Sequence, residues 1–424
     1  MPDRTQKEPL VPKLRFPEFQ DAGEWEVKRL RDVFQERSER NGYGLELLSV
    51  TLSDGVVKSS QLDKKINTSA DLSNYKKVYP NDIVYNSMRM WQGASGVSKW
   101  HGIVSPAYTV ITPLAKQDSF FWGYYLKHPE NIDKFARFSQ GVTSDTWNLK
   151  FPAFSRIRVP VPSLPEQQKI ADCLSSLDEL IRLEAQKCTA LKAHKKGLMQ
   201  QLFPQEGETT PRLRFPEFKD AGEWKTVPLG NLLERNPEYG VNAPAAPYSP
   251  YLPTYLRITD IDDDGRFLSN SRVSVDIVAT ENNYLEPGDI VLARTGASVG
   301  KSYRYRKEDG RLVFAGFLIR IRPNRNKVNP IFLANFFNSQ RYWNWVALTS
   351  ARSGQPGISG KEYSSLPVPL PPKKLDENGI TEQDRIANCL SSLDELIERQ
   401  SRKVEALKML KKGLMQQLFP QEVV

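Results

Sequence analysis

The nonapeptide CLSSLDELI stands at Cys173–Ile181 and returns unchanged at Cys389–Ile397. Two further conserved stretches frame each copy: LRFPEFQDAGEW or LRFPEFKDAGEW at 14–25 and 213–224, and KKGLMQQLFPQE at 195–206 and 411–422. The residues between these stretches differ in the two copies, and the second copy is longer. The sequence therefore predicts an internal repeat in which a variable segment of domain size is followed by a conserved tail.

Each conserved tail carries a heptad pattern. Seam residues advance by alternating steps of four and three from Ile170 to Leu202, and in the same register from Ile386 to Leu418. A seam kept over about four heptads is typical of a coiled coil. The apolar residues predicted to form this helix interface are Leu174, Leu177, Ile181, Leu191 and Leu198 in the first copy, and Leu390, Leu393, Ile397, Leu407 and Leu414 in the second. Prolines at both ends predict that the first helix runs from about residue 165 to 203.

The two helices are predicted to pair with each other in antiparallel orientation, because the second variable segment begins where the first helix ends. The shared register, with a pseudo-twofold axis near the helix centres, places Leu174 beside Leu414 and Leu198 beside Leu390. The same symmetry predicts that the C-terminal LFPQEVV ends beside the N-terminal LRFPEF, so that the chain is nearly circular.

Two seam positions near the predicted axis are polar. Glu184 and Gln400 occupy positions where coiled coils usually bury an apolar side chain. A buried polar layer would fix the register at some cost in stability. The alternative is that both residues lie on a frayed, solvated edge of the helix pair.

The variable segments predict mixed α/β domains that are divergent versions of one fold. Each contains a short β-branched run after a turn, a strand pair ending in proline, a helical stretch, and a strand in which prolines alternate. In this order the ranges are 80–86, 102–113, 120–138 and 157–162 in the first segment, and 287–294, 311–323, 330–348 and 366–371 in the second. Because proline cannot donate to a ladder, the last strand of each segment is predicted to lie at a sheet edge.

Composition points to an anionic partner. The chain has 59 Lys and Arg against 50 Asp and Glu, a net charge of +9, which favours nucleic acid, although an ordinary basic protein is the alternative. The first residues lack a signal-peptide pattern and no apolar run approaches membrane-spanning length, so we expect a cytoplasmic protein without membrane contact. Its three cysteines and three histidines show no CxxC or HxxxH spacing, which argues against disulfides and a metal site.

Two motifs resemble ligand-binding loops, but the residues around them argue against a phosphate site and a calcium site. TGASVGKS at 295–302 ends like a phosphate-binding loop, but Thr295 replaces the required first glycine and a strand is predicted to follow. DIDDDG at 260–265 begins like a calcium loop, but Ser271 stands where a bidentate Glu is required. The three histidines complete no catalytic constellation, so we expect no catalytic residue.

The repeated motifs resemble those of the specificity subunit of type I restriction-modification systems. PEQQKIADCLSSLDELI at 165–181 with KKGLMQQLF at 195–203 carries the resemblance, and the second copy departs from it slightly as TEQDRIANCLSSLDELI after the insertion KKLDENG. The resemblance covers essentially the whole chain. It implies an α/β (α+β) fold: two mixed α/β target recognition domains separated by two long conserved helices that form an antiparallel intramolecular coiled coil. The expected ranges are 1–163 and 207–379 for the domains, and 164–206 and 380–424 for the conserved helical regions.

The resemblance also implies a function. Such a subunit is non-catalytic and recognises a bipartite double-stranded DNA target, one half-site per domain, while the helices set the gap between the half-sites. It directs two modification subunits and the restriction subunits to that target. It binds no cofactor itself, and S-adenosylmethionine, ATP and Mg²⁺ belong to the partners. The main alternative is a coiled-coil scaffold that binds proteins and not DNA, and salt dependence separates the two because DNA affinity falls steeply with salt.

Loops that combine basic, amide and hydroxyl side chains are the candidates for DNA contact, because Arg reads guanine, Asn or Gln reads adenine, and Ser or Thr positions phosphate. In the first domain these are Asn86, Ser87, Arg89, Gln92, Gln140, Thr143, Ser144 and Lys150; in the second they are Arg294, Thr295, Ser298, Lys301, Arg352, Ser353 and Gln355. The alternative for any one of them is a surface loop away from DNA. Trp91 and Trp147 are expected to be core residues or loop anchors.

Overall fold

Two units share the long helices of the chain. The computed structural model describes residues 10–62, 71–262 and 264–420. Unit 1 comprises Met1–Ala185 and Arg402–Val424, and unit 2 comprises Gln186–Ser401. Each unit therefore combines one variable segment, the first half of the helix that follows it, and the last half of the other long helix.

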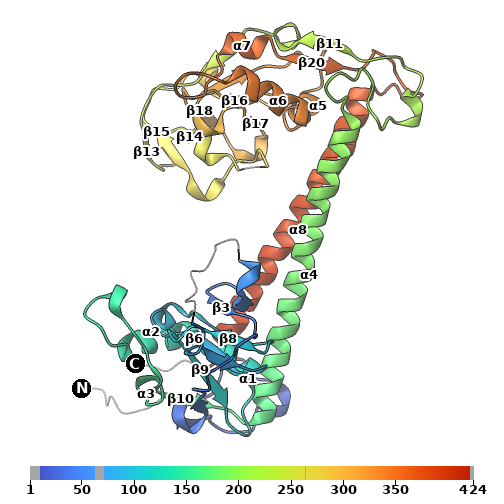
Figure 1. Cartoon of the computed structure of the whole chain (residues 1–424). Helices are drawn as coiled ribbons and strands as arrows, with labels where there is room; N and C mark the ends of the chain where they lie inside the picture. The colour runs from blue at the N-terminus through green and yellow to red at the C-terminus, as the bar shows by residue number, and fades with distance from the viewer. Residues whose placement is uncertain (1–9, 63–70, 263, 421–424) are drawn as a thin grey trace. The chain divides into compact units, whose positions relative to one another are not determined.

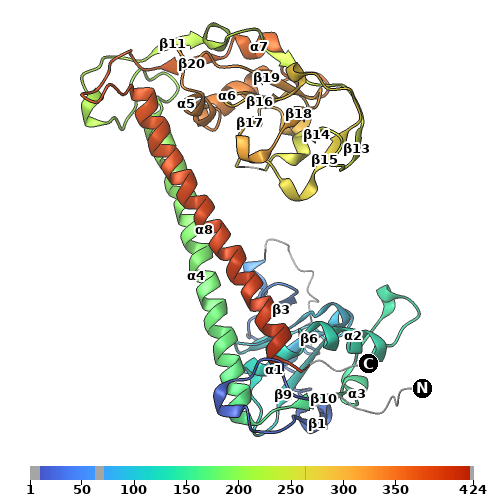
Figure 2. The same ribbon diagram turned by 180° about the vertical axis from the view of Figure 1, so that it is seen from behind.

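The long helices are α4 (Leu164–Leu202) and α8 (Glu382–Leu418), which lie side by side in both views (Figures 1 and 2). Ion pairs give their direction. In unit 1, Asp178 of α4 pairs with Lys411 of α8 and Glu184 pairs with Lys403. In unit 2, Lys195 of α4 pairs with Asp394 of α8. The α8 partner number falls as the α4 number rises, so the predicted antiparallel coiled coil is confirmed.

The heptad seam is the buried side of these helices. Leu174 and Leu414 belong to one apolar core in unit 1, and Leu198 and Leu390 belong to one core in unit 2, as the register predicted. None of the ten predicted interface residues is exposed. Full burial of such a branched side chain contributes about 1.5–3 kcal/mol, and the partly buried members of the seam contribute less.

The polar seam positions are not solvated. Gln400 is 8% exposed, and the side chain of Glu184 is 13% exposed and paired with Lys403. The alternative of a frayed edge is therefore wrong, and both polar groups are enclosed by the helix pair.

The two variable segments form the same sheet. In unit 1 its strands run in the order β2 (Phe34–Glu36), β9 (Tyr108–Pro113), β6 (Ile83–Asn86) and β7 (Ser95–Val97). In unit 2 the order is β12 (Glu238–Tyr239), β19 (Leu318–Ile321), β16 (Ile290–Ala293) and β17 (Ser302–Arg304). All neighbours are antiparallel. The divergent sequences therefore build one topology, as predicted.

Smaller sheets complete each unit. Unit 1 pairs β3 (Leu48–Thr51) with β4 (Gly55–Lys58) and β5 (Lys76–Val78) with β8 (Gly102–Val104); unit 2 orders β13 (Ala245–Pro247), β15 (Val273–Val275), β14 (Thr254–Leu256) and β18 (Leu312–Phe314) in one sheet. The proline-alternating strands form two-stranded ribbons: β10 (Arg158–Val161) with β1 (Glu26–Arg29), and β20 (Pro367–Leu370) with β11 (Lys225–Pro228). Their prolines lie in edge strands, as predicted.

Each predicted helical stretch is a pair of helices. They are α1 (Ser119–Tyr125) with α2 (Pro129–Phe138), and α5 (Pro330–Phe336) with α6 (Gln340–Thr349). Pro129 begins α2, where its missing N–H is harmless, and the side chain of Ser339 caps α6. A short helix then precedes each ribbon, α3 (Phe151–Phe154) or α7 (Gly360–Ser364).

The conserved stretches at 14–25 and 213–224 join each domain to both long helices. Arg15 binds both carboxylate oxygens of Glu166 at the start of α4, each at 2.8 Å, and Arg214 binds Glu382 of α8 in the same way. The N–H of Leu14 donates to Gln417 near the end of α8 at 2.9 Å. The stretch that begins at Leu14 therefore meets the end of α8 in unit 1, as predicted for the described part of the chain.

Candidate DNA-reading surfaces

Three loops meet at one end of the main sheet in each unit. Reading surface 1 consists of residues 86–92 after β6, the β8–β9 turn at 105–108, and the loop at 139–150. Reading surface 2 consists of residues 294–298 after β16, the β18–β19 turn at 315–318, and the loop at 349–358. The first and third loops of each set are those that the sequence predicted as candidates for DNA contact. The structure places them next to each other.

Equivalent backbone hydrogen bonds hold the three loops. In unit 1, Ser87 N–H donates to Ala107, and Leu149 N–H donates to Ser87 at 2.8 Å. In unit 2, Arg294 N–H donates to Phe317 at 3.1 Å, and Ile358 N–H donates to Arg294 at 2.9 Å. Ser87 and Arg294 are thus equivalent positions on the two surfaces, and so are Ala107 and Phe317.

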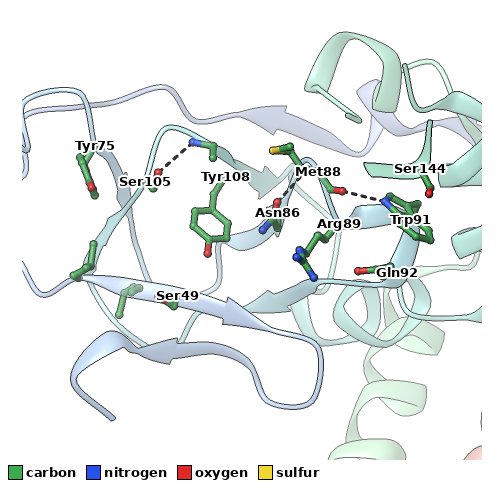
Figure 3. A pocket seen from close by; sticks show the side chains of 13 residues that line it. Ser49, Tyr75, Asn86, Met88, Arg89, Trp91, Gln92, Ser105, Tyr108 and Ser144 are labelled. Carbon is green, nitrogen blue, oxygen red and sulfur yellow. Dashed lines mark hydrogen bonds between the residues drawn. The ribbon is translucent and has the colours of Figure 1, made fainter. Parts of the chain in front are cut away.

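Reading surface 1 borders an open pocket of about 490 Å³, which residues 47–49 and Tyr75 also line. Four predicted residues line it, namely Asn86, Arg89, Gln92 and Ser144. Figure 3 shows Arg89 between Asn86 and Gln92, with Tyr108 on the other side of Asn86. Hydrogen-bonding groups and aromatic rings therefore share one concave surface.

The polar groups of this pocket have unused donors. Asn86 accepts a hydrogen bond from Met88 N–H at 3.0 Å through its carbonyl oxygen, which leaves its amide group for another partner. The side chains of Arg89 and Gln92 are exposed and have no hydrogen bond or ion pair within the described residues. Amide and guanidinium groups in this state are suited to adenine and guanine edges respectively.

The tryptophans of surface 1 anchor its loops, as expected. The rings of Trp91 and Trp147 meet edge to face at 5.3 Å between centroids, which joins the first loop to the third. The indole N–H of Trp91 donates to Met88 at 3.0 Å. Aromatic pairs of this kind contribute about 0.5–1.5 kcal/mol beyond their burial.

The other four predicted residues of unit 1 lie outside the pocket lining. Ser87 is buried and its hydroxyl is bonded to Ala107 and Thr109, so its side chain holds the loop and faces no solvent. Gln140 pairs with Asn148 through two backbone hydrogen bonds, and Thr143 closes the tip of that hairpin. Lys150 is exposed immediately before α3.

Arg294 is the best-placed basic group of reading surface 2. Its guanidinium carbon lies 4.8 Å from the ring centroid of Tyr239, and the side chain has no hydrogen bond within the described residues. The hydroxyl of Tyr239 accepts the N–H of Gly360 at 3.0 Å, which fixes the ring. The stack orients the guanidinium and leaves its donors unused, so they are available for bidentate contact with guanine.

Gln355 lies close to the Arg294 loop. Gly296 has φ +76°, and a side chain there would come within 3.0 Å of the Gln355 amide nitrogen. The N–H of Gly296 donates to Pro356 at 3.0 Å, and Thr295 pairs with Gly357. Glycine is thus favoured at 296 because of its left-handed backbone conformation.

Two predicted basic residues of unit 2 are already occupied. Lys301 donates to the backbone oxygen of Ile261 at 2.9 Å. Arg352 donates to Thr349 and Ala351 and pairs with Glu362. The backbone N–H of Ser359, with Arg352 as a lesser cause, holds the pKa of Glu362 below its usual range, so this pair stays charged at neutral pH. Ser298 is half-buried, and Ser353 is exposed on the Arg352 loop.

Family comparison identifies the class of these surfaces. The sequence profile of the type I restriction modification DNA specificity domain matches residues 22–193 and 222–409, one match for each repeat. The chain belongs to this family. Its members are specificity subunits and not enzymes, so the chain is a non-catalytic subunit for sequence-specific DNA recognition.

Relatives match along nearly the whole chain. The putative type I restriction enzyme MjaX specificity subunit of Methanocaldococcus jannaschii is 22% identical over 435 residues, with 93% of each chain covered. The MjaVIII specificity subunit of the same organism is 24% identical, with 96% of this chain and 93% of the relative covered. The solved type I S subunit of M. genitalium has a TM-score of 0.57 at 16% identity, covering 97% of this chain and all of that one, which shows a shared fold.

The motifs that suggested other chemistry have structural roles in this specificity subunit. Residues 295–302 form a short 3-10 turn and then strand β17, with no helix to receive phosphate. Asp262 accepts the N–H groups of Asp264 and Arg266 in a turn, while Asp263 lies outside the described residues. Elsewhere in the described ranges, no group of three or more His, Cys, Asp or Glu is placed to hold a metal ion, and no helix is long and apolar enough to cross a membrane.

Sequence reasoning missed four aromatic residues in or beside the two surfaces. Tyr75 and Tyr108 line the pocket of surface 1, Phe317 belongs to surface 2, and the ring of Tyr239 stacks on the Arg294 guanidinium of that surface. Tyr108 and Phe317 lie in the turn of each predicted strand pair, so the repeated strand–turn–strand pattern was the available signal. Tyr239 comes from a two-residue strand that no pattern in the sequence indicates.

Proposed function

We propose that each variable segment reads one half of a bipartite double-stranded DNA target. The observation that carries this proposal is that the same three loops meet in both units, held by equivalent hydrogen bonds, yet present different side chains. Asn86, Arg89 and Gln92 line the pocket of surface 1, whereas surface 2 carries Arg294 and Gln355. The same loop arrangement with different base-contacting side chains is what recognition of two different half-sites requires.

Within this proposal, residues 1–163 and 207–379 are the target recognition domains and 164–206 and 380–424 are the conserved helical regions. Arg89 and Arg294 contact guanine, and Asn86, Gln92 and Gln355 contact adenine. Ser144, Thr295, Ser298 and Ser353 position the phosphate backbone, and Gln140, Thr143 and Lys150 border it. Ser87, Lys301 and Arg352 hold their loops in place and do not read bases.

Partner subunits supply the chemistry in this proposal. Two modification subunits dock on equivalent surfaces of the two helical regions, where the repeated nonapeptide presents an exposed leucine, Leu180 or Leu396. Exposed leucines at equivalent positions, outside the helix interface, fit two identical partners. S-adenosylmethionine is bound by those partners, and ATP and Mg²⁺ by the restriction subunits.

The test is the methylated motif of a host that carries this chain with its modification partner. We expect adenine methylation in a bipartite sequence with a fixed gap. A chain that binds its partners but yields no bipartite motif would support the protein scaffold instead. DNA affinity of the assembled complex should also fall steeply between low and moderate salt, which a purely protein-binding scaffold would not show.

A further inference from the structure

An exposed aromatic side chain projects from the middle loop of reading surface 2. Phe317 is 62% exposed, although a phenyl ring is normally among the more buried side chains of a protein. It lies in the turn between β18 and β19, which Leu318 N–H closes by donating to Ala315 at 2.8 Å.

The backbone around Phe317 is fixed on both sides. Gly316 N–H donates to Val241 at 2.8 Å, and the Phe317 carbonyl accepts Arg294 N–H at 3.1 Å. A loose loop could fold the ring inward, but this turn is tied to two neighbouring segments. The exposed ring is therefore a feature of an ordered surface.

The same position in unit 1 is occupied by Ala107, whose carbonyl accepts the equivalent hydrogen bond from Ser87 N–H. The fold does not need a large side chain in this turn, because unit 1 builds it with a methyl group. The phenyl ring is thus specific to surface 2, as expected of a residue that reads the second half-site and not of one that stabilises the shared fold.

We propose that Phe317 is a specificity-determining residue that contacts the C5-methyl group of a thymine in the second half-site. This inference rests on the proposed function. A phenyl ring has no hydrogen-bonding group, and the thymine methyl is the apolar feature of the major groove that such side chains contact. The neighbouring Arg294 contacts a guanine edge in the same groove, so the thymine belongs to a base pair next to that G·C pair.

The test compares DNA substrates that carry thymine or deoxyuridine, which differ only in this methyl group. The complete methyltransferase assembly is used, and each thymine of the second half-site is replaced in turn. With the unmodified protein, one replacement should slow methylation about fourfold at subsaturating DNA, the effect of losing one buried methyl group. Phe317→Ala should methylate the two substrates at equal rates, whereas Phe317→Leu should keep a preference for thymine.

The Tyr251→Ala variant is the matched control, because Tyr251 is a 94% exposed aromatic residue of the same unit outside the three loops. It should retain the full preference. Three results would overturn the inference. The second half-site could contain no thymine on either strand, or the Phe317→Ala protein could keep its preference for thymine over deoxyuridine. The third is that Phe317→Ala fails to assemble with a partner subunit and has no other defect. If the unmodified protein yields no bipartite motif, the proposed function itself is wrong. If the motif is present and one of the three results above is found, only the inference about Phe317 is wrong.

Discussion

The Lys411 ammonium group lies 2.6 and 2.7 Å from the two carboxylate oxygens of Asp178. The same pair recurs in unit 2 between Lys195 and Asp394, at 2.7 and 2.6 Å. The lysine belongs to the repeated KKGLMQQLF and the aspartate to the repeated CLSSLDELI. The two motifs are therefore contact partners in each unit, which accounts for the presence of both in both copies.

We expect this ion pair to contribute modestly to stability, because its groups are partly exposed. Asp178 is 43% and Lys411 22% exposed, and such pairs contribute about 1 kcal/mol or less. Asp178 also accepts the hydroxyl of Tyr124 at 2.7 Å. Asp178→Ala should therefore lower the free energy of unfolding more than Lys411→Ala, measured by urea denaturation.

A double-mutant cycle with both changes gives the coupling of the pair. A coupling energy well above about 1 kcal/mol would contradict the expectation, as would equal effects of the two single substitutions. The exchanged pair Asp178→Lys with Lys411→Asp should recover part of the loss.

Arg294 and Arg352 should differ as DNA-reading residues. Arg294→Ala should relax the base preference at one position of the second half-site. The discrimination against the wrong base there should fall by about 1–3 kcal/mol, roughly 5- to 150-fold. Arg352→Ala should leave base preference unchanged, because Arg352 already pairs with Glu362. The methylated motif of each variant gives the result, and Arg89→Ala, which should affect only the first half-site, is the control. Equal relaxation of both half-sites by Arg294→Ala would contradict separate reading.

The helices and the repeat were predictable because their causes are local. The seam from Ile170 to Leu202 repeats at fixed spacing, and spacing alone determines which side of a helix is apolar. The contacts that a loop side chain makes depend on neighbours that are distant in sequence, so local patterns do not predict them. The sequence gives no sign that Lys301 donates to the backbone of Ile261 or that Arg352 pairs with Glu362. Tyr239 was missed because its role comes from its position beneath Arg294 and not from any sequence pattern.

The stability of unit 1 should fall below neutral pH because of His128. This side chain is buried and packs against Phe419, with ring centroids 5.6 Å apart. Burial, with a smaller effect of Lys134, lowers the pKa of His128 from its usual value. The unfolded chain then binds a proton more readily than the folded chain, so stability is complete above about pH 6.5 and is lost as the pH falls through the lowered pKa.

The measurement is the melting temperature between pH 5 and 8 for the unmodified protein and His128→Gln. The variant should be less stable at pH 8, because it loses packing, and should show a shallower decline towards pH 5. If the melting temperature fell equally towards pH 5 in both proteins, His128 would not be the cause of the decline.

A circular permutant tests the meeting of the two chain ends in unit 1. Joining residue 424 to residue 1 through a short linker and opening the chain at Gly207 should give a folded protein with the same methylated motif. Gly207 is exposed and has φ +80°, and a side chain added there would meet no atom within 4 Å, so a break at this residue removes no packing. Circular dichroism and the methylated motif are the measurements. A matched permutant opened at Leu292, within the buried strand β16, should fail to fold.

The helices should set the gap between half-sites without affecting base preference. One extra heptad at equivalent places in α4 and α8 lengthens each by about 10 Å, the rise of seven helical residues. This corresponds to about three base pairs of B-DNA at 3.4 Å each. The methylated motif should keep both half-sites and gain a gap longer by about that amount, because the reading surfaces are built from loops outside the helices. Inserting the heptad into α4 alone would misalign Lys195 with Asp394, and that control should lose stability. A changed base preference in the doubly extended protein, with an unchanged gap, would show that the helices take part in reading and do not act as a spacer.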